Sequence, residues 1–241
     1  MEFTLDSIRD IKVYQSKRGY RFSVEPLLLY DFVNLKIVRN IADLGAGSGI
    51  IGILLAKRYP YAHATLFEIQ DSLVVLAEKN ITLNSLGDRV KVIKTDIRDI
   101  KTSHSPLTIH HSFDLAISNP PFRRLKSGLM SEEKERAIAR HEITLKLPEL
   151  IEAAAHLLKA KGRFCIIYLP QRLLELMEIL KKKGLEPKKL RFVHSNLSSE
   201  AKAILLEAVK GGKGGLKVEN PLYIYKEDGS YTDEMMKIYM G

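Results

Sequence analysis

The sequence predicts an α/β fold in which a mostly parallel β-sheet carries helices on both faces. Short apolar stretches of strand length alternate along the chain with longer stretches of helical periodicity, and this alternation is typical of strand–helix–strand units. Glycine or proline stands at the end of several stretches and marks where each one stops. The last two strands of the predicted sheet are joined by a short loop instead of a helix, so we expect the final strand to run antiparallel.

The individual elements follow from local patterns of apolar and helix-ending residues. The predicted strands lie at 38–44, 64–69, 90–94, 113–118, 163–169, 190–193, 203–209 and 222–225. The predicted helices lie at 50–58, 72–83, 147–158 and 172–183, with a final helix near the C-terminus. Pro60 ends the first helix, Asp71 can cap the second, and Gly87 and Gly162 end the second and third. Residues 123–140 are expected to form a loop with a partial helix, and 211–215 a glycine-rich turn.

Composition narrows the class of protein. A chain of 241 residues with 45% hydrophobic and 28% charged residues is typical of a globular protein, so overall disorder is excluded. No apolar run reaches the length of about 20 residues that a transmembrane helix needs, and the N-terminus shows no secretory signal pattern.

The single cysteine, Cys165, cannot form an internal disulfide and is expected in the core, which suits a cytoplasmic location. The formal net charge of +9 favours polyanions, nucleic acid above all.

A glycine-rich turn follows the first predicted strand of the sheet. It reads Asp43-Leu-Gly45-Ala-Gly47-Ser-Gly49 and leads into a helix, where glycines allow a sharp turn and a close approach of a ligand to the backbone. Gly47, Gly49 and Gly52 also match the G-x-G-x-x-G pattern of dinucleotide sites. Asp43, two residues before Gly45, favours a ligand with an ammonium group over one with a pyrophosphate.

Acidic residues end the next two strands. Glu68 can accept hydrogen bonds from both hydroxyls of a ribose, and Asp96 can accept one from the exocyclic amine of an adenine. Because the carboxyl ends of parallel strands meet at one edge of a sheet, these residues and the glycine turn are expected to line one crevice.

The fourth strand ends in Asn119-Pro120-Pro121-Phe122. This pattern suits methylation of a planar amine, whose lone pair is delocalised and therefore a poor nucleophile. Hydrogen bonds from the amine to Asn119 Oδ1 and the Pro120 carbonyl would stabilise the positive charge that develops there. Phe122 would stack on the base and orient it beside the methyl donor.

The two motifs together resemble those of the class I S-adenosylmethionine-dependent amino-methyltransferases. Further segments at 20–29, 139–142 and 214–219 resemble the bacterial tRNA adenine-N6 methyltransferases that modify the anticodon loop of valine tRNA. The resemblance implies a Rossmann-like, seven-stranded class I methyltransferase sheet and the cofactor S-adenosyl-L-methionine. It implies that Asp43 and the glycines hold the methionine part, Glu68 the ribose and Asp96 the adenine. The full set of expected cofactor residues is Asp43, Gly45, Ala46, Gly47, Gly49, Glu68, Ile69, Asp96, Ile97 and Asn119.

On this interpretation residues 1–241 form one methyltransferase domain. Its core is 38–210, with an N-terminal extension at 1–37 that contributes to the cofactor and substrate site and an appendage at 211–241 with a strand and a helix. Structured RNA, with tRNA favoured, is the expected partner, and Arg123, Arg124 and Lys126 are expected to contact its phosphates. No membrane and no metal are expected, since the histidines lack metal-ligand spacing. The oligomeric state stays open between monomer and homodimer.

Three other functions stay open at this point. The Asn-Pro-Pro-aromatic motif is shared by methyltransferases that act on a glutamine amide of a release factor. It is also shared by those that act on the exocyclic amine of guanine in ribosomal RNA. A noncatalytic nucleotide-binding module would need only the glycine turn, and the intact motif at 119–122 argues against it.

Overall fold

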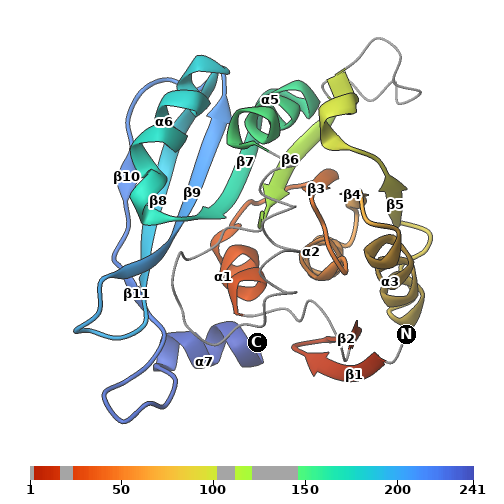
Figure 1. Cartoon of the computed structure of the whole chain (residues 1–241), viewed down its shortest axis with the longest axis horizontal. Helices are drawn as coiled ribbons and strands as arrows, with labels where there is room; N and C mark the ends of the chain where they lie inside the picture. The colour runs from red at the N-terminus through yellow and green to blue at the C-terminus, as the bar shows by residue number, and fades with distance from the viewer. Residues whose placement is uncertain (1–2, 17–23, 102–111, 121–145) are drawn as a thin grey trace, which may run out of the picture.

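The computed structural model of the chain describes residues 3–16, 24–101, 112–120 and 146–241 (Figure 1). An antiparallel hairpin of β1 (Phe3–Ile8) and β2 (Ile11–Ser16) comes first, and helix α1 (Glu25–Phe32) follows. The sequence did not predict these three elements, since 1–37 was interpreted only as an extension.

The remaining elements alternate in the predicted manner. They are β3 (Asn40–Leu44), α2 (Ile50–Arg58), β4 (His63–Glu68), α3 (Asp71–Leu83), β5 (Val90–Lys94), η1 (Ile97–Lys101), β6 (Phe113–Ser118), α5 (Leu147–Leu157), β7 (Leu158–Tyr168), η2 (Pro170–Arg172), α6 (Leu173–Lys182), β8 (Leu185–His194), β9 (Ala201–Lys210), β10 (Lys217–Val218), β11 (Leu222–Tyr223) and α7 (Asp233–Met240). The predicted loop with a partial helix at 123–140 lies outside the described residues.

The sheet confirms the predicted fold class. Its long strands lie in the order β5-β4-β3-β6-β7-β9-β8, and the short strands β10 and β11 each pair with β8. The pairs β4–β5, β3–β4, β3–β6 and β6–β7 are parallel, whereas β9 is antiparallel to both of its neighbours. The seven long strands with the last one reversed form the Rossmann-like α/β arrangement that the motifs implied.

Two strands start five residues before their predicted first residues. Strand β7 starts at Leu158, directly after α5, and Gly162 lies inside the strand instead of ending the helix. A Cβ on Gly162 would lie 3.0 Å from the Phe113 carbonyl oxygen, so this glycine permits a close approach of β6 where the pairing register shifts. Strand β8 starts at Leu185, five residues before the predicted start, and runs through Pro187 at a second shift of register. Proline is rare at inner positions of a sheet because it has no backbone N–H to donate. The sequence pattern therefore did not predict residues 185–189 as strand.

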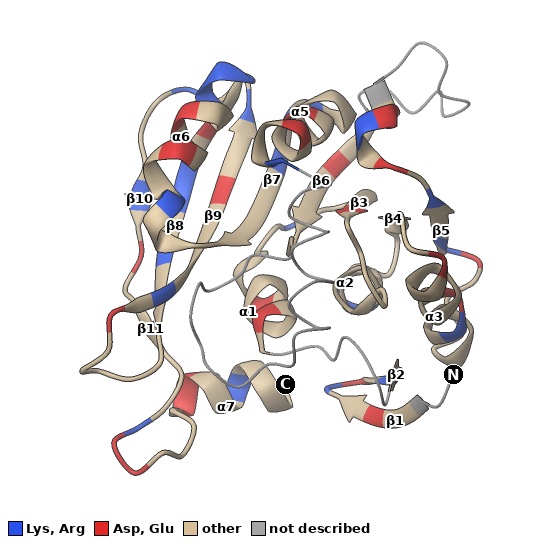
Figure 2. Ribbon diagram, viewed as in Figure 1, with Lys and Arg blue, Asp and Glu red and all other residues tan. Residues whose placement is uncertain are grey.

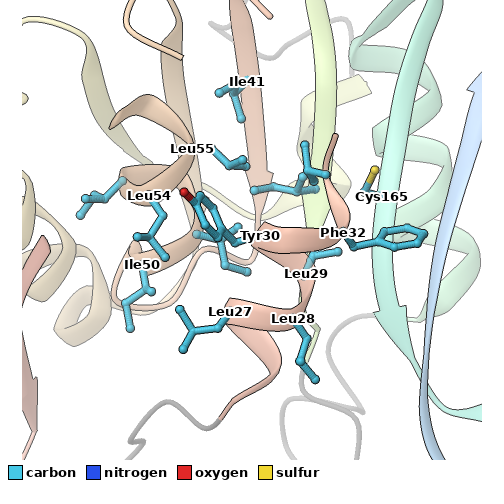
Figure 3. Packing of buried hydrophobic residues seen from close by; sticks show 14 of the residues in the cluster. Leu27, Leu28, Leu29, Tyr30, Phe32, Ile41, Ile50, Leu54, Leu55 and Cys165 are labelled. Atoms are coloured by element: carbon cyan, nitrogen blue, oxygen red, sulfur yellow. The ribbon is translucent and has the colours of Figure 1, made fainter. Parts of the chain in front are cut away.

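Each face of the sheet is covered by its own hydrophobic cluster. Helices α1, α2 and α3 cover one face, and α5 and α6 cover the other (Figure 1). Figure 3 shows the side chains of α1 packed between α2 and the sheet, with Cys165 of β7 beside them. Leu27 and Leu29 are completely buried, and so is Cys165, which confirms that this cysteine is a core residue. Burial raises the pKa of its thiol above the usual range.

The extension is fastened to the core through the end of α2. The Arg58 guanidinium donates to the carbonyl oxygens of Tyr30 at 2.8 Å and Val33 at 2.6 Å, and it lies 3.6 Å from the centre of the Tyr30 ring. These carbonyls belong to the last turn of α1, where the helix itself supplies no donors. One residue of α2 therefore fixes the end of α1 by hydrogen bonds and by a cation–π contact.

Basic residues gather at the end of α6 and along β8 and β10 (Figure 2). This surface includes the lysines at 181–183 and 188–189. Lys189 also contacts α1, because its Nζ donates to the Phe32 carbonyl oxygen at 2.8 Å and lies 3.8 Å from the centre of the Phe32 ring. Within the described ranges, no helix combines the length and apolarity needed to cross a bilayer.

Candidate functional site

Four parallel strands bring the predicted site residues to one edge of the sheet. Strands β6, β3, β4 and β5 are neighbours in that order, so the segments that follow their carboxyl ends lie side by side (Figure 1). Asn119, the glycine turn and Asp96 lie in the segments after β6, β3 and β5, and Glu68 is the last residue of β4. Open α/β sheets bind ligands at this edge.

The glycine turn exposes backbone atoms that no side chain covers at Gly45 and Gly47. Gly45, Gly47 and Gly49 all have left-handed backbone conformations, with φ of 73°, 58° and 83°. A Cβ on Gly45 or Gly47 would meet no other atom within 4 Å, so nothing in the described chain fills the space next to them. The amides of Gly45 and Ala46 both donate to the Phe67 carbonyl oxygen, at 2.9 and 3.1 Å, which fixes the turn against β4. The turn is therefore a preformed surface that a ligand can approach closely.

Two glycines serve packing instead of access. A Cβ on Gly49 would lie 2.9 Å from Leu66 Cδ1, and one on Gly52 only 2.2 Å from Leu66 Cδ2. Leu66 is completely buried in β4, so α2 can approach the sheet only without these side-chain atoms. The G-x-G-x-x-G match thus reflects close packing of α2 on the sheet at Gly52.

Asp43 lies beneath the glycine turn. Its side chain is 1% exposed, and its Oδ2 accepts a hydrogen bond of 3.0 Å from the Gly52 amide in the first turn of α2. The N-cap residue of α2 is Gly49, which has no side chain to do this. Burial raises the pKa of Asp43 to about 7, the Gly52 hydrogen bond lowers it, and the nearby Glu68 charge adds to the rise. The structure thus shows Asp43 capping α2, while its contact with a ligand ammonium stays a prediction.

Glu68 holds the turn from the neighbouring strand. Its Oε2 accepts a hydrogen bond from the Gly47 amide, and its Oε1 accepts from the amides of Ile69 and Gln70, each at 2.9 Å. A carboxylate offers about four lone-pair sites, so the contacts with described residues leave one acceptor position for a ligand hydroxyl. Ile69 follows directly, and its apolar side chain is 41% exposed at the same edge.

Asp96 is engaged by a residue that the sequence interpretation overlooked. Its carboxylate accepts from the backbone amide of Arg98 at 2.9 Å and pairs with the Nε and Nη2 of the Arg98 guanidinium. The side-chain hydrogen bond from Arg98 is the largest cause that lowers the pKa of Asp96. An adenine amine would have to share this carboxylate with Arg98. Ile97 is 6% exposed and packs in the cluster on the α5 face, so its contact with a cofactor stays a prediction.

Asn119 and Pro120 stand next to the glycine turn. Both are half-buried and follow Ser118, whose Oγ donates to the Leu44 carbonyl oxygen at 2.7 Å. Leu44 directly precedes Gly45, and Ser118 is completely buried. This single bond joins the end of β6 to the start of the turn. Other predicted residues lie outside the described ranges, namely Pro121, Phe122, Arg123, Arg124 and Lys126.

Two residues of this site were missed at the sequence level. Ser118 was counted only as the end of a strand, although a hydroxyl next to Asn119 was a usable signal. Asn80 lies in α3, is completely buried, and its Nδ2 donates to the Ser48 carbonyl oxygen of the turn at 3.0 Å. A polar residue beside the buried positions Leu76, Ala77 and Ile81 was the signal that could have found it.

Among the described residues, no group of three His, Cys, Asp or Glu side chains is placed to hold a metal ion.

Solved methyltransferase structures share this fold. A predicted O-methyltransferase from Agrobacterium tumefaciens matches with a TM-score of 0.70 and 21% identity, over 88% of this chain and 94% of that chain. M. jannaschii TYW2 in complex with AdoMet matches with a TM-score of 0.59 and 16% identity, over 86% of this chain and 85% of that chain. At these identities the likeness concerns the fold.

Curated relatives carry the name tRNA1(Val) (adenine(37)-N6)-methyltransferase. Two are from strains of Porphyromonas gingivalis, one 35% identical over 71% of this chain and the other 36% identical over 58%. The chain spans only 66% and 53% of the length of these two proteins. A third, from Pedobacter heparinus, is 27% identical over 93% of this chain and 92% of its own length. The predicted resemblance to this group of enzymes is confirmed.

A family model described as methyltransferase small domain matches residues 25–186. The matched range begins with α1 and ends in β8, so it contains the glycine turn, Glu68, Asp96 and Asn119. It covers more than half of the 241 residues. The chain therefore belongs to the methyltransferase small domain family.

Proposed function

We propose that the chain transfers a methyl group from S-adenosyl-L-methionine to the exocyclic N6 amine of an adenine in tRNA. The observation that carries this proposal is the Ser118–Leu44 hydrogen bond of 2.7 Å. It places Asn119, the expected acceptor for the amine, beside the turn that is expected to hold the cofactor. The names of the relatives, tRNA1(Val) (adenine(37)-N6)-methyltransferase, support the same reaction and the same class of RNA.

The residues present fit the cofactor. The open space next to Gly45 and Gly47 admits a ligand to the backbone of the turn. Glu68 has one acceptor position left for a ribose hydroxyl, and Ile69 offers an exposed apolar surface for the adenine ring. Bound there, S-adenosyl-L-methionine supplies an electrophilic methyl group on a sulfonium centre. The buried carboxylate of Asp43 stabilises positive charge on the ligand from below the turn.

Asn119 and Pro120 hold the target amine. The amine donates one N–H to Asn119 Oδ1 and the other to the Pro120 carbonyl oxygen, so that its lone pair faces the cofactor. As the nitrogen bonded to the methyl group and the methyl–sulfur bond broke, the nitrogen would become positive, and both acceptors would stabilise this charge in the transition state. The nitrogen would then release one of its protons to solvent. Phe122 stacks on the base and holds it at the angle that this transfer needs.

The substrate is proposed to be a loop base of a structured RNA. A base in a stem would first have to be unstacked at a cost of a few kcal/mol, whereas a loop base is already accessible. The net charge of +9 supplies an attraction to phosphates that does not depend on sequence. Arg123, Arg124 and Lys126 follow the Asn119 motif directly in the chain and are proposed to contact flanking phosphates. A cytoplasmic location, where tRNA is found, belongs to this proposal.

The experiment that tests the proposal asks which macromolecule is methylated. The full chain is incubated with methyl-labelled S-adenosyl-L-methionine and, separately, with unmodified total RNA and with a protein extract that contains release factors. We expect label in RNA only, and an apparent KM for tRNA that rises steeply with salt while kcat changes less. Label in a protein glutamine with none in RNA would overturn the choice of substrate.

A further inference from the structure

Two asparagines, Asn80 in α3 and Asn84 at the C-cap of this helix, hold the N-terminal hairpin by its backbone. Asn80 Oδ1 accepts from the Tyr14 amide at 2.7 Å, and Asn80 Nδ2 donates to the Tyr14 carbonyl oxygen at 3.3 Å. Asn84 repeats the contact one helical turn later, with the Lys12 amide at 3.1 Å and the Lys12 carbonyl oxygen at 2.7 Å. The hairpin thus docks beside α3 (Figure 1).

The spacing of these residues explains why the docking works. Four residues along an α-helix advance about 6 Å, and two residues along a strand advance about 6.7 Å. Asn80 and Asn84 are therefore separated by nearly the same distance as Tyr14 and Lys12, whose side chains point to the same face of β2. Each side-chain amide then satisfies both backbone groups of one strand residue, in the manner of a neighbouring strand.

Asn80 differs from Asn84 in one further contact. Its second N–H donates to the Ser48 carbonyl oxygen at 3.0 Å, and Ser48 lies between Gly47 and Gly49 in the turn. Asn84 donates instead to the Asn80 carbonyl oxygen within α3, at 2.8 Å. Asn80 is completely buried, so both contacts are shielded from competing water. One amide group therefore joins β2 to the turn.

We propose that Asn80 is a positioning residue that sets the shape of the cofactor turn and couples it to the docked hairpin. The inference rests on the proposed function and gives a physical route by which the extension at 1–37 contributes to the cofactor site. Glycines at 45, 47 and 49 leave the turn many other conformations. Asn80 stabilises one of these conformations through its hydrogen bond to the Ser48 carbonyl oxygen. Without this bond, part of the binding free energy of the cofactor would be used to order the turn, and the affinity would fall.

The test compares Asn80→Ala with its matched control Asn84→Ala in the full chain. Both variants lose a two-point contact with β2, and only Asn80→Ala loses the contact with the turn. The dissociation constant for S-adenosylhomocysteine is measured by calorimetry, kcat and the KM for S-adenosyl-L-methionine by methyl transfer, and stability by urea unfolding. We expect Asn80→Ala to raise the dissociation constant and the KM about tenfold, with kcat at saturating cofactor within about threefold of wild type, since one conformational restraint is lost. Asn84→Ala should lower stability and leave the dissociation constant within about twofold, because its contacts end at the hairpin.

Equal effects of the two variants on cofactor affinity would overturn the inference, and so would an unchanged affinity in Asn80→Ala. If Asn80→Ala does not fold, Asn80→Asp replaces it, since the aspartate keeps the acceptor for the Tyr14 amide and loses the N–H donors to the carbonyl oxygens of Ser48 and Tyr14. The same loss of cofactor affinity is then expected. A wild-type chain that binds neither S-adenosyl-L-methionine nor S-adenosylhomocysteine would overturn the proposed function as well. Wild-type binding with no difference between the variants would overturn this inference alone.

Discussion

Replacing Asp43 by asparagine should stabilise the protein above neutral pH and lower its affinity for the cofactor. The carboxylate is completely enclosed, and burial raises its pKa from 3.8 to about 7. Asparagine has the same shape, and its Oδ1 can still accept from the Gly52 amide, 3.0 Å from the present Oδ2. Asp43→Asn therefore removes the charge and leaves the packing nearly unchanged.

The size of the effect follows from the shift in pKa. Between pH 4 and 7 the unfolded chain releases the Asp43 proton while the folded chain keeps it, so the contribution of Asp43 to stability falls as pH rises through this window. Each unit of pKa corresponds to about 1.4 kcal/mol, so the loss at pH 8 is at most about 4 kcal/mol. The amide N–H groups of the replacement need partners, and a buried N–H without one costs about 1–3 kcal/mol. We therefore expect Asp43→Asn to be more stable than wild type at pH 8 and equal or less stable at pH 4.

Urea unfolding of both proteins from pH 4 to 8.5 measures this difference directly. Titrating groups far from Asp43 contribute equally to both proteins, so their effects cancel in the difference, whereas the action of the Glu68 charge on Asp43 is part of the measured effect. The gap should widen in favour of Asp43→Asn up to about pH 7 and stay constant above it. Calorimetry at pH 8 should show weaker binding of S-adenosyl-L-methionine to the variant, because the anionic partner of its positive charges is gone. A gap that does not change with pH would refute the assignment of a raised pKa to Asp43.

Other predictions concern the rest of the site. Asn119→Ala should lower kcat by about 10²–10³ while calorimetry shows a far smaller change in cofactor binding, since it removes one acceptor that acts in the transition state. Glu68→Gln should weaken cofactor binding, because one carboxylate oxygen that accepts backbone N–H groups becomes an amide donor; binding equal to wild type would contradict its role. Gly52→Ala should lower stability by about 1–3 kcal/mol in urea unfolding, because its Cβ would lie 2.2 Å from Leu66 Cδ2. Gly87→Ala, where a Cβ meets nothing within 4 Å, is its control and should change stability far less.

The features that sequence could predict are those encoded in neighbouring residues. The glycine turn, Glu68 and Asn119 each sit where an apolar strand stops, so their order along the chain already placed them at one edge of a parallel sheet. The reversed last strand followed from a short connection. Local chemistry and strand order were enough for these.

The features that sequence missed depend on contacts between distant residues. The burial of Asp43 depends on how closely α2 approaches β4. The docking of the hairpin depends on Asn80 of α3 meeting Tyr14, 66 residues earlier in the chain. Hydrophobic periodicity carries no information about such pairs.

The identity of the methylated nucleoside tests the central claim most directly. Unmodified tRNA is incubated with the full chain and S-adenosyl-L-methionine, digested to nucleosides and separated by chromatography with mass detection. The proposed reaction predicts N6-methyladenosine, in wild-type reactions and not in those with Asn119→Ala. A product of N2-methylguanosine, or tRNA left unmethylated while the enzyme methylates a protein, would contradict transfer to adenine N6.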